Sequence, residues 1–209
     1  MPSIHMTLLF MAAGLALNFT PGPDMLYVAA RSTSEGRAAG LASAIGIFVG
    51  CLFHIAAMAF GLSALLLRVP SAYDAVRFLG AGYLVFLGVR ALFWPADLAA
   101  RLQAKAASRT AVFLQGVWTN VLNPKVALFF LAFLPQFLAP ARGPIAVQIV
   151  VLGLLFNTTG LFVNGGVALL ASRATGWLRR RPEAGRGLQR FTGALFVGLG
   201  VRLALASRR

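Results

Sequence analysis

Acidic residues, cysteine and charged residues in general are scarce in this sequence. Only 5 of its 209 residues are Asp or Glu, and charged residues make up 11%, whereas soluble domains carry about 25%. A single cysteine, Cys51, excludes an internal disulfide and a cysteine metal cluster. The few acids offer no paired carboxylates, no nucleophile–base pair and no metal-ligand cluster. We therefore expect no enzyme, no metal and no cofactor.

Apolar residues are abundant instead. They make up 59% of the chain, and the mean hydropathy is +0.80, well above the roughly 45–50% apolar content of soluble domains. The composition predicts an integral membrane protein whose main partner is the lipid bilayer. The net charge of +14 could suggest nucleic-acid binding. However, the basic residues lie between the apolar segments and are not interleaved with stacking aromatics, so we expect no nucleic-acid partner.

Six stretches are apolar and long enough to approach the roughly 20 residues that a membrane crossing needs. The linkers between them are short, the longest being 95–111 and 172–190, so the chain reads as one transmembrane domain over 1–209. No Lys or Arg precedes the first apolar stretch, so we expect a retained span rather than a cleaved secretory signal. The predicted spans are 6–30, 39–67, 77–94, 113–139, 145–171 and 191–206.

The positive charges are distributed unevenly between the two sides that alternating spans define. Twelve Lys and Arg residues fall on the side that contains Arg31 and Arg37, and Lys125 lies within a span. The positive-inside rule makes the richer side cytoplasmic, so both termini are predicted to face outside. The other side receives six: Arg68, Arg77, Arg142, Arg202, Arg208 and Arg209.

The sequence also repeats itself. "VFLGVRAL" (85–92) resembles "VGLGVRLA" (197–204), so that Gly88 matches Gly200, and "GIFVG" (46–50) resembles "GLFVN" (160–164). Pro23 and Pro124 occupy similar places in the first and fourth spans. These matches predict two three-helix repeats, approximately 1–100 and 110–209. Because three is odd, the second copy enters the membrane from the opposite side, the inverted-repeat plan of many secondary transporters.

The first span is interrupted by "LNFTPGPDML" (17–26). A proline in a helix interior costs roughly 3 kcal/mol, and backbone groups freed by such a break are tolerated in a membrane only where they face protein or a cavity. We therefore predict a broken helix whose freed backbone binds a polar substrate; the alternative is a kink that only permits packing. The candidate substrate-binding residues are Asn18, Thr20, Pro21, Gly22 and Pro23.

The fourth span contains a second break, "TNVLNPK" (119–125), with Asn120, Asn123 and Pro124 as further candidate substrate-binding residues. Lys125 is the one cation deep in a span, and a buried ammonium needs a partner. Asp24 occupies the matching position of the first repeat, so we hypothesise an ion pair that couples transport to proton movement. The alternative is that Lys125 snorkels to an interface and anchors the fourth span.

Two further features of the spans have alternative interpretations. His54 in the second span could relay protons, because the imidazole titrates near neutral pH, or it could only join two helices by a hydrogen bond. Several glycines of the second and fifth spans are expected to permit close helix packing rather than to bind substrate. They are Gly40, Gly46, Gly50, Gly153, Gly160, Gly165 and Gly166.

At these motifs the chain resembles the LysE/RhtB family of amino-acid exporters. The matching segments are "NFTPGPDML" (18–26), "GRAAGLASAIGIFVG" (36–50), "GAGYLVFLGVRAL" (80–92), "FLQGVWTNVLNPKVALFFLAFLPQF" (113–137) and "TGALFVGLGVRLAL" (192–205). The resemblance runs nearly end to end. It implies a six-span, all-α inner-membrane exporter of amino acids, driven by the proton gradient. By position, the residues it points to are Pro21, Gly22, Pro23, Asn120, Asn123, Pro124 and Lys125.

The sequence thus predicts a secondary transporter that exports amino acids or close derivatives from the cytoplasm by proton antiport. Export of another small solute or a cation is the alternative, disfavoured because the spans hold one acid, one lysine and no Cys/His cluster. A membrane protein without transport activity, such as a scaffold, would not need two polar breaks. No motif in the sequence identifies the substrate. The sequence is also compatible with a homo-oligomer.

Overall fold

The computed structural model describes residues 2–62 and 107–180 continuously, and single positions between 78 and 93 and between 183 and 205. The described residues are mostly helical and include no strand, as the sequence predicts. The parts of the predicted spans 77–94 and 191–206 between the single positions lie outside the described residues. The helices are α1 (Ile4–Phe19), α2 (Pro23–Glu35), α3 (Arg37–Ala57), α6 (Arg109–Val121), α7 (Pro124–Leu128) and α8 (Ile145–Arg180).

Two helices are long and apolar enough to cross a membrane by themselves. They cover Arg37–Gly61, which is α3 and a π-helical turn (η1, Met58–Leu62), and Ile145–Ala171 of α8. Two bent pairs pass the same test, α1 with α2 at 47° and Arg109–Val121 with Pro124–Phe137 at 41°. The second member of that last pair is α7 with a π-helical turn (η2, Phe129–Phe133) and a 3-10 turn (η3, Leu134–Phe137). The described part thus contains two to four spans.

The bent pairs coincide with the predicted breaks, although several boundaries differ from the prediction. The first pair extends to Glu35 rather than to residue 30, and α8 continues to Arg180, nine residues beyond the predicted end of its span. The added part of α8 falls in the predicted linker 172–190. Hydropathy marks where a segment leaves the lipid, but a helix can continue into water when its residues favour helix.

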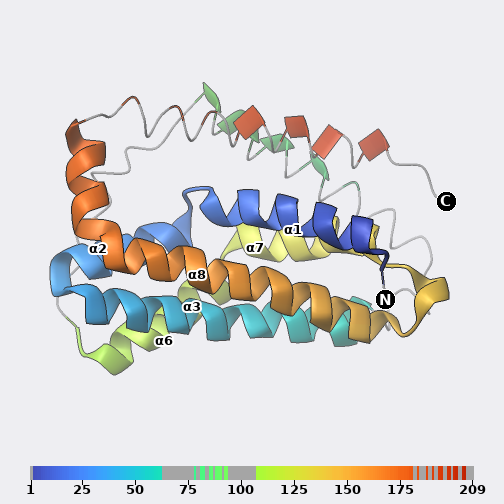
Figure 1. The fold of residues 1–209 in the computed structure, drawn as a ribbon, viewed down its shortest axis with the longest axis horizontal. Coiled ribbons are helices and arrows are strands. Elements are labelled where there is room, and N and C mark those ends of the chain that lie inside the picture. The colour runs from blue at the N-terminus through green and yellow to red at the C-terminus, as the bar shows by residue number, and fades with distance from the viewer. Residues whose placement is uncertain are drawn as a thin grey trace.

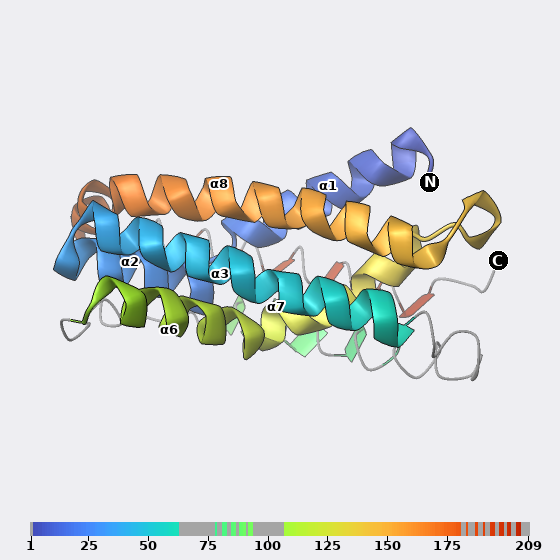
Figure 2. The ribbon, with the colours of Figure 1, turned by 90° about the horizontal axis from the view of Figure 1, so that it is seen from below.

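The helices run along one axis of the bundle, with α1 and α8 in one direction and α3 and α6 in the other. In Figure 1, the start of α1 and the start of α8 lie at one end, whereas α2 and the starts of α3 and α6 lie at the other. The bent pair that begins with α1 therefore runs opposite to the pair that begins with α6, as Figure 2 also shows. α3 contacts α2, α6 and α8, and α8 also contacts α1.

Local sequence signals explain where the helices start. Ser3 and Ser108 are N-caps whose hydroxyls accept hydrogen bonds from the backbone N–H groups of Met6 and Ala111, each at 3.3 Å. The second half of each bent pair begins with a proline at its first position, where the missing N–H costs no hydrogen bond. Gly36, with φ of 90°, forms the tight turn between α2 and α3.

Glycines bring α3 and α6 into backbone contact. A Cβ added to Gly46 would lie 2.2 Å from the carbonyl oxygen of Phe113, and one added to Gly50 would lie 2.5 Å from that of Val117. The close approach places the end of α6, which carries the second break, beside α3. The prediction of glycine packing is confirmed here. Among the described residues, nothing lies within 4 Å of a Cβ added to Gly165 or Gly166.

Replacing Gly46 with leucine is expected to destabilise the protein strongly, because a side chain there overlaps the backbone of α6 and neither helix can yield. Overpacking typically costs about 1–3 kcal/mol, so the melting temperature in detergent should fall by roughly 2–12 °C. Gly165→Ala is the control, since its added Cβ has open space and alanine favours helix. Equal melting temperatures for wild type and Gly46→Leu would contradict this packing.

The largest apolar cluster lies at the end of the bundle where α1 and α8 begin. Phe10 of α1 is fully buried, with ring centroids 5.6 Å from Phe129 and 5.4 Å from Phe137. Phe156 of α8 stacks on Phe129 with centroids 4.7 Å apart. Such aromatic contacts add about 0.5–1.5 kcal/mol each beyond the burial of area. The cluster therefore closes this end of the bundle with tightly packed aromatic rings.

The described single positions near residues 80–90 and 193–200 contain a reciprocal contact. A Cβ added to Gly88 would lie 2.6 Å from the carbonyl oxygen of Gly193 and 2.7 Å from Val197. A Cβ added to Gly200 would lie 2.8 Å from the carbonyl oxygen of Ala81. Gly88 and Gly200 are equivalent in the sequence repeat, and at the same offset Ala81 is equivalent to Gly193. The two contacts are therefore related by exchange of the repeats.

Candidate functional site

The first break ends α1 with carbonyl groups that its own helix does not satisfy. Thr20 closes the last turn, its N–H reaching the carbonyls of Ala16 and Leu17 and its hydroxyl donating to Ala16 at 2.8 Å. Beyond it, Pro21 and Pro23 have no N–H with which to continue the ladder. The sequence thus produces a helix end inside the bundle that needs an external donor.

Lys125 supplies that donor from the second break. Its ammonium nitrogen donates to the carbonyl oxygens of Leu17 at 2.9 Å and Thr20 at 2.8 Å. A Cβ added to Gly22 would lie 3.2 Å from the same nitrogen, so the absence of a side chain at Gly22 makes room for the lysine. A cation at a helix C-terminus is favourable because the partial charge there is negative. Lys125 therefore caps α1 across the two breaks and does not snorkel away from the site.

The second break carries two buried asparagines. Asn123 is the N-cap of α7, and its Oδ1 accepts from the N–H of Lys125 at 3.0 Å. Asn120, in the last turn of α6, donates from Nδ2 to Oδ2 of Asp24 at 2.8 Å. Asp24 lies in the first turn of α2, where the helix dipole favours a negative charge. The two charges that were predicted to meet therefore belong to one site, with each placed at the helix end that suits its sign.

Asp24 and Lys125 do not form a direct ion pair in the structure. Within the residues that it describes, the one ion pair closer than 4.0 Å joins Arg31 to Glu35. Asp24 contacts the amide of Asn120, while Lys125 contacts carbonyl oxygens of α1. The connection between the charges runs through the second break, whose asparagines are within two to five residues of Lys125 in the chain.

His54 joins this group from α3. Its Nε2 lies 3.0 Å from the carbonyl oxygen of Asn120, and its ring stacks on Phe130 with centroids 6.1 Å apart. Because a carbonyl oxygen only accepts hydrogen bonds, Nε2 carries the proton in this contact. The contact is the hydrogen bond between two helices that was the alternative interpretation of His54. It also holds the end of α6, where the second break begins, against α3.

Three buried polar atoms of the site make no hydrogen bond of good geometry, although the carboxyl of Asp24 and the side-chain amide of Asn123 lie close enough to interact. They are Oδ1 of Asp24, Oδ1 of Asn120 and Nδ2 of Asn123. Asn120 and Asn123 are only 2% and 1% exposed. Leaving such groups unpaired costs about 1–3 kcal/mol each, and buried polar groups in proteins are nearly always paired. A polar ligand with donors could pair with Oδ1 of Asn120 and, by displacing the amide of Asn123, with Oδ1 of Asp24.

Two predicted site residues make other contacts. Asn18 donates from Nδ2 to the carbonyl oxygen of Phe156 at 3.2 Å and to the hydroxyl of Thr159 at 3.0 Å, so it ties α1 to α8. The hydroxyl of Thr20 is bound within its own helix. Within the described ranges, no three His, Cys, Asp or Glu side chains are grouped so that they could hold a metal ion.

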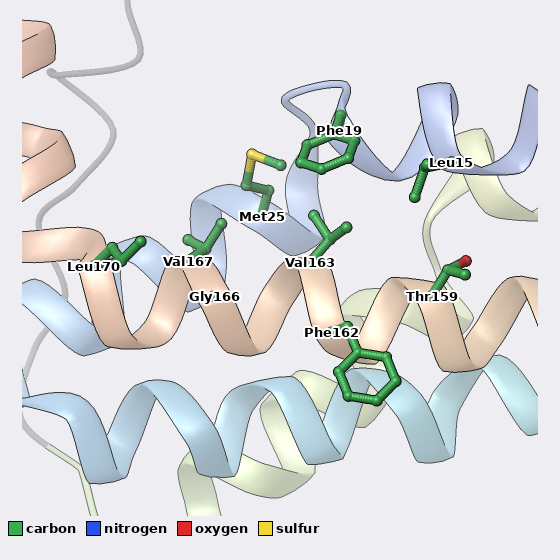
Figure 3. Close-up of a pocket in the computed structure, with 9 residues that line it drawn as sticks. All are labelled: Leu15, Phe19, Met25, Thr159, Phe162, Val163, Gly166, Val167 and Leu170. Carbon is green, nitrogen blue, oxygen red and sulfur yellow. The ribbon is translucent and has the colours of Figure 1, made fainter. Parts of the chain in front are cut away.

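A separate apolar pocket of about 600 Å³ lies where the first break faces α8 (Figure 3). Leu15 and Phe19 of α1 and Met25 of α2 form one wall, and α8 forms the other. No charged side chain lines the pocket, so it suits an apolar group rather than a zwitterion. The α8 residues of the lining are Thr159, Phe162, Val163, Gly166, Val167 and Leu170.

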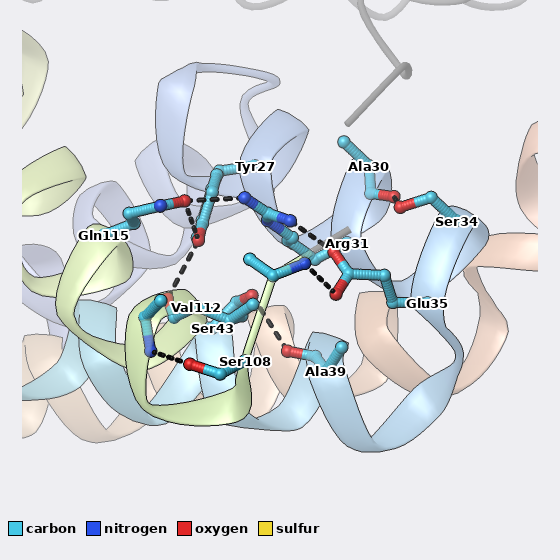
Figure 4. A network of polar contacts seen from close by, with 12 residues as sticks. Tyr27, Ala30, Arg31, Ser34, Glu35, Ala39, Ser43, Ser108, Val112 and Gln115 are labelled. Atoms are coloured by element: carbon cyan, nitrogen blue, oxygen red, sulfur yellow. Dashed lines mark hydrogen bonds and ion pairs between the residues drawn. The ribbon is translucent and has the colours of Figure 1, made fainter. Parts of the chain in front are cut away.

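A second polar network, which the sequence did not reveal, joins α2 to α6 (Figure 4). The guanidinium of Arg31 pairs with Glu35 and donates to Oε1 of Gln115 at 2.6 Å. The hydroxyl of Tyr27 lies 2.8 Å from the carbonyl oxygen of Val112 and 3.2 Å from the same Oε1. Glu35 also accepts from the N–H of Ala107 at 3.0 Å, and Arg31 lies over the ring of Tyr27. We call this group the α2–α6 latch.

The residue spacing on α2 is a weak signal for the latch. Tyr27, Arg31 and Glu35 are spaced by four residues and so lie on one face of α2. In the sequence, Arg31 counts only as one of the positive charges that set the topology. Their partner Gln115 lies 84 residues from Arg31, a separation at which sequence alone does not show contact.

Comparison with known proteins places the chain among membrane proteins. The family model described as LysE type translocator matches residues 15–207. An uncharacterised membrane protein of Pseudomonas aeruginosa is 33% identical over 194 residues, covering 90% of this chain and 89% of that protein. No solved structure matches the chain significantly.

Two relatives carry functional names. The homoserine/homoserine lactone efflux protein of Salmonella typhimurium is 30% identical over 199 residues, with 94% of this chain and 95% of that protein covered. The leucine efflux protein of the same organism is 26% identical over 200 residues, with 93% and 92% covered. Both names describe efflux of a small metabolite from the cell.

Proposed function

The chain belongs to the LysE-type translocator family, and on that premise we propose that it exports amino acids or close derivatives from the cytoplasm across the bacterial inner membrane. Family membership makes the protein a membrane transporter rather than an enzyme. The names of the homoserine and leucine efflux proteins support an amino-acid substrate. An amino-acid substrate also agrees with the polar groups at the two helix breaks, which can bind an ammonium and a carboxylate group.

The three buried atoms without a hydrogen bond of good geometry are the observation that carries the proposal. Oδ1 of Asp24 and Oδ1 of Asn120 are acceptors suited to an ammonium group, and Nδ2 of Asn123 is a donor suited to a carboxylate. The ammonium of Lys125 uses two of its three N–H groups on carbonyls, which leaves one for the same carboxylate. The site thus matches the backbone of an amino acid and says little about its side chain.

We further propose that the protein has six spans built as two inverted three-helix repeats. The opposite directions of the two bent pairs support this arrangement, as do their matching prolines at the first helical position. The reciprocal contacts of Gly88 and Gly200 support it at the third and sixth spans. Inverted repeats place the substrate site between the broken helices and let each half close one side.

Proton antiport is the proposed energy source, with Asp24 as the coupling group. Its Oδ1 can hold either the ammonium group of the substrate or a proton, but not both. A cycle that releases substrate outside and takes up a proton there therefore moves the two in opposite directions. One charge crossing 100 mV supplies about 2.3 kcal/mol, enough for an outward gradient of about 40-fold for a neutral zwitterion.

The orientation proposed has both termini outside, so that Arg31, Arg37 and Arg109 face the cytoplasm. In the structure Arg31 lies four residues before the end of α2, and Arg37 and Arg109 lie in the first turns of α3 and α6; these helix ends share one end of the bundle (Figure 1). A common location for residues from three helices supports the charge asymmetry that the sequence indicated.

The exporter assignment is tested by expressing the protein in bacteria loaded with dipeptides that release a panel of amino acids, including leucine and homoserine. Cells that produce the wild type should excrete at least one amino acid several-fold faster than cells with an empty vector. Cells that carry Lys125→Met at the same membrane level serve as the matched control and should excrete at the vector rate. Equal excretion by all three strains for every amino acid would overturn the assignment.

A further inference from the structure

The α2–α6 latch lies between the polar site and the end of the bundle that carries Arg37 and Arg109. Arg31 is seven residues beyond Asp24 on α2, and Gln115 is five residues before Asn120 on α6. At a rise of 1.5 Å per residue these separations are about 10 Å and about 8 Å. Both arms of the latch therefore stand at a similar depth on the same side of the site.

The latch connects elements that belong to opposite halves of the chain. α2 is the second half of the first bent pair, and α6 is the first half of the second pair. Its interactions span 72 to 88 residues of sequence, from Ala107–Glu35 to Tyr27–Gln115. Because α2 leads away from one break and α6 leads into the other, any separation of the two halves on this side must break these contacts.

We propose that the α2–α6 latch is the cytoplasmic gate of the transporter, closed in this structure and opened to admit substrate. This inference rests on the proposed function for its direction, since the substrate enters from the cytoplasm. Arg31 holds the two helices together through Gln115, while Glu35 fixes Arg31 and the backbone at Ala107. None of these residues contacts the three buried atoms of the polar site, so they act by controlling access.

The chemistry of the latch suits a contact that must open and close. A hydrogen bond between protein groups exchanges for bonds to water with a small net change in free energy. The open latch can therefore be hydrated on the cytoplasmic side without a large penalty. At the opposite end, the contact between the halves is the cluster of Phe10, Phe129 and Phe137, whose separation would expose apolar rings. The two ends of the site are thus closed by different chemistry.

Access to the site from each face tests the gate directly. A reporter protein carries Cys51→Ser, which removes the only native thiol, and Asn123→Cys at the buried asparagine. A membrane-impermeant maleimide is applied to inside-out vesicles, which expose the cytoplasmic face, and to right-side-out vesicles. Gln115→Leu removes the oxygen that both Arg31 and Tyr27 contact and should raise labelling from the cytoplasmic face about tenfold, as expected for loss of a hydrogen bond to a charged group.

Gln115→Glu keeps the acceptor and adds a charge opposite Arg31, so it should slow cytoplasmic labelling several-fold. Opposite effects of two substitutions at one position distinguish a gate from a static brace, whose loss would only destabilise the protein. Thr110→Val, at an exposed position on α6, is the control and should leave the labelling rate unchanged. Melting temperatures of the purified variants verify that each is folded.

Three outcomes would overturn the gate. They are unchanged labelling in both Gln115 variants, faster labelling by Gln115→Leu from the outer face, and equal changes from both faces. Labelling does not require export. The labelling experiment therefore tests the gate, and the export experiment tests the proposed function, independently of each other. The predicted labelling pattern in a protein that exports no amino acid of the panel would retain the gate and reject the substrate assignment.

Discussion

Replacing Lys125 with methionine is expected to reduce export at least about 100-fold while leaving the protein in the membrane. The ammonium makes two hydrogen bonds to the carbonyls of Leu17 and Thr20. Charge-assisted bonds of this kind contribute about 1.5–3 kcal/mol each, and 2.7 kcal/mol already corresponds to 100-fold. Methionine fills a similar volume without a donor, so the end of α1 loses its cap and the substrate carboxylate loses its cation.

The measurement is the initial rate of amino-acid efflux, normalised to the amount of protein in the membrane. Lys125→Arg should recover part of the activity, because a guanidinium can also donate to two carbonyls, though from a larger group beside Gly22. Arg109→Met removes a cation at an exposed position of α6 and should export at the wild-type rate. Wild-type efflux by Lys125→Met would show that the cation is dispensable. It would reject the proposal that Lys125 caps α1 and binds the substrate carboxylate.

The breaks could be predicted because they depend on local covalent chemistry. Pro23 and Pro124 cannot sit inside a helix without removing a hydrogen bond, and both begin a new helix in the structure. Hydropathy located the spans for a similarly simple reason, since the bilayer requires a minimum apolar length. The partners of the side chains were less accessible, because they depend on how helices from opposite halves pack.

Lys125 illustrates that limit. The sequence repeat matches Lys125 with Asp24, and this match predicted that both residues belong to one site. Their charges did not predict that the ammonium group of Lys125 would donate to backbone carbonyls. Those acceptors exist only because the break leaves the last turn of α1 incomplete. Similarly, Asn18 is polar and lies beside the break, yet its amide faces α8 because of the rotation of α1. Helix rotation is fixed by packing across the whole bundle.

The latch shows the same limit for charged residues near a helix end. A cationic arginine at the cytoplasmic end of a span is the usual signal of topology, and nothing in the sequence separated Arg31 from Arg37. In the structure Arg31 is buried against Tyr27 and Gln115, whereas Arg37 is exposed. Residues of one type and similar position can thus set orientation or hold two helices together, depending on the face of the helix they occupy.

Replacing Asp24 with asparagine is expected to abolish the response of transport to a pH gradient. Asparagine cannot carry a proton in exchange for substrate. If its Oδ1 keeps the bond from Asn120, its Nδ2 takes the place of Oδ1 of Asp24 and presents a donor where an acceptor stood. An ammonium group would then meet a donor, so substrate affinity should also fall, by about tenfold for loss of one charge-assisted bond.

Proteoliposomes separate these two effects. Leucine and homoserine are the test substrates, and uptake driven by an imposed pH gradient is compared with exchange of labelled for unlabelled substrate at equal pH. Wild type should show both activities and accelerate with the gradient, whereas Asp24→Asn should retain only exchange at higher substrate concentration. Asp24→Glu preserves an ionisable carboxyl and should keep a gradient response, and Glu183→Gln is the control for loss of an exposed acid.

Because exchange needs no net proton movement, its survival would show that Asp24→Asn still folds and binds. A gradient response that persists in that variant would instead assign the proton to another group, with His54 as the nearest alternative on the contacts described.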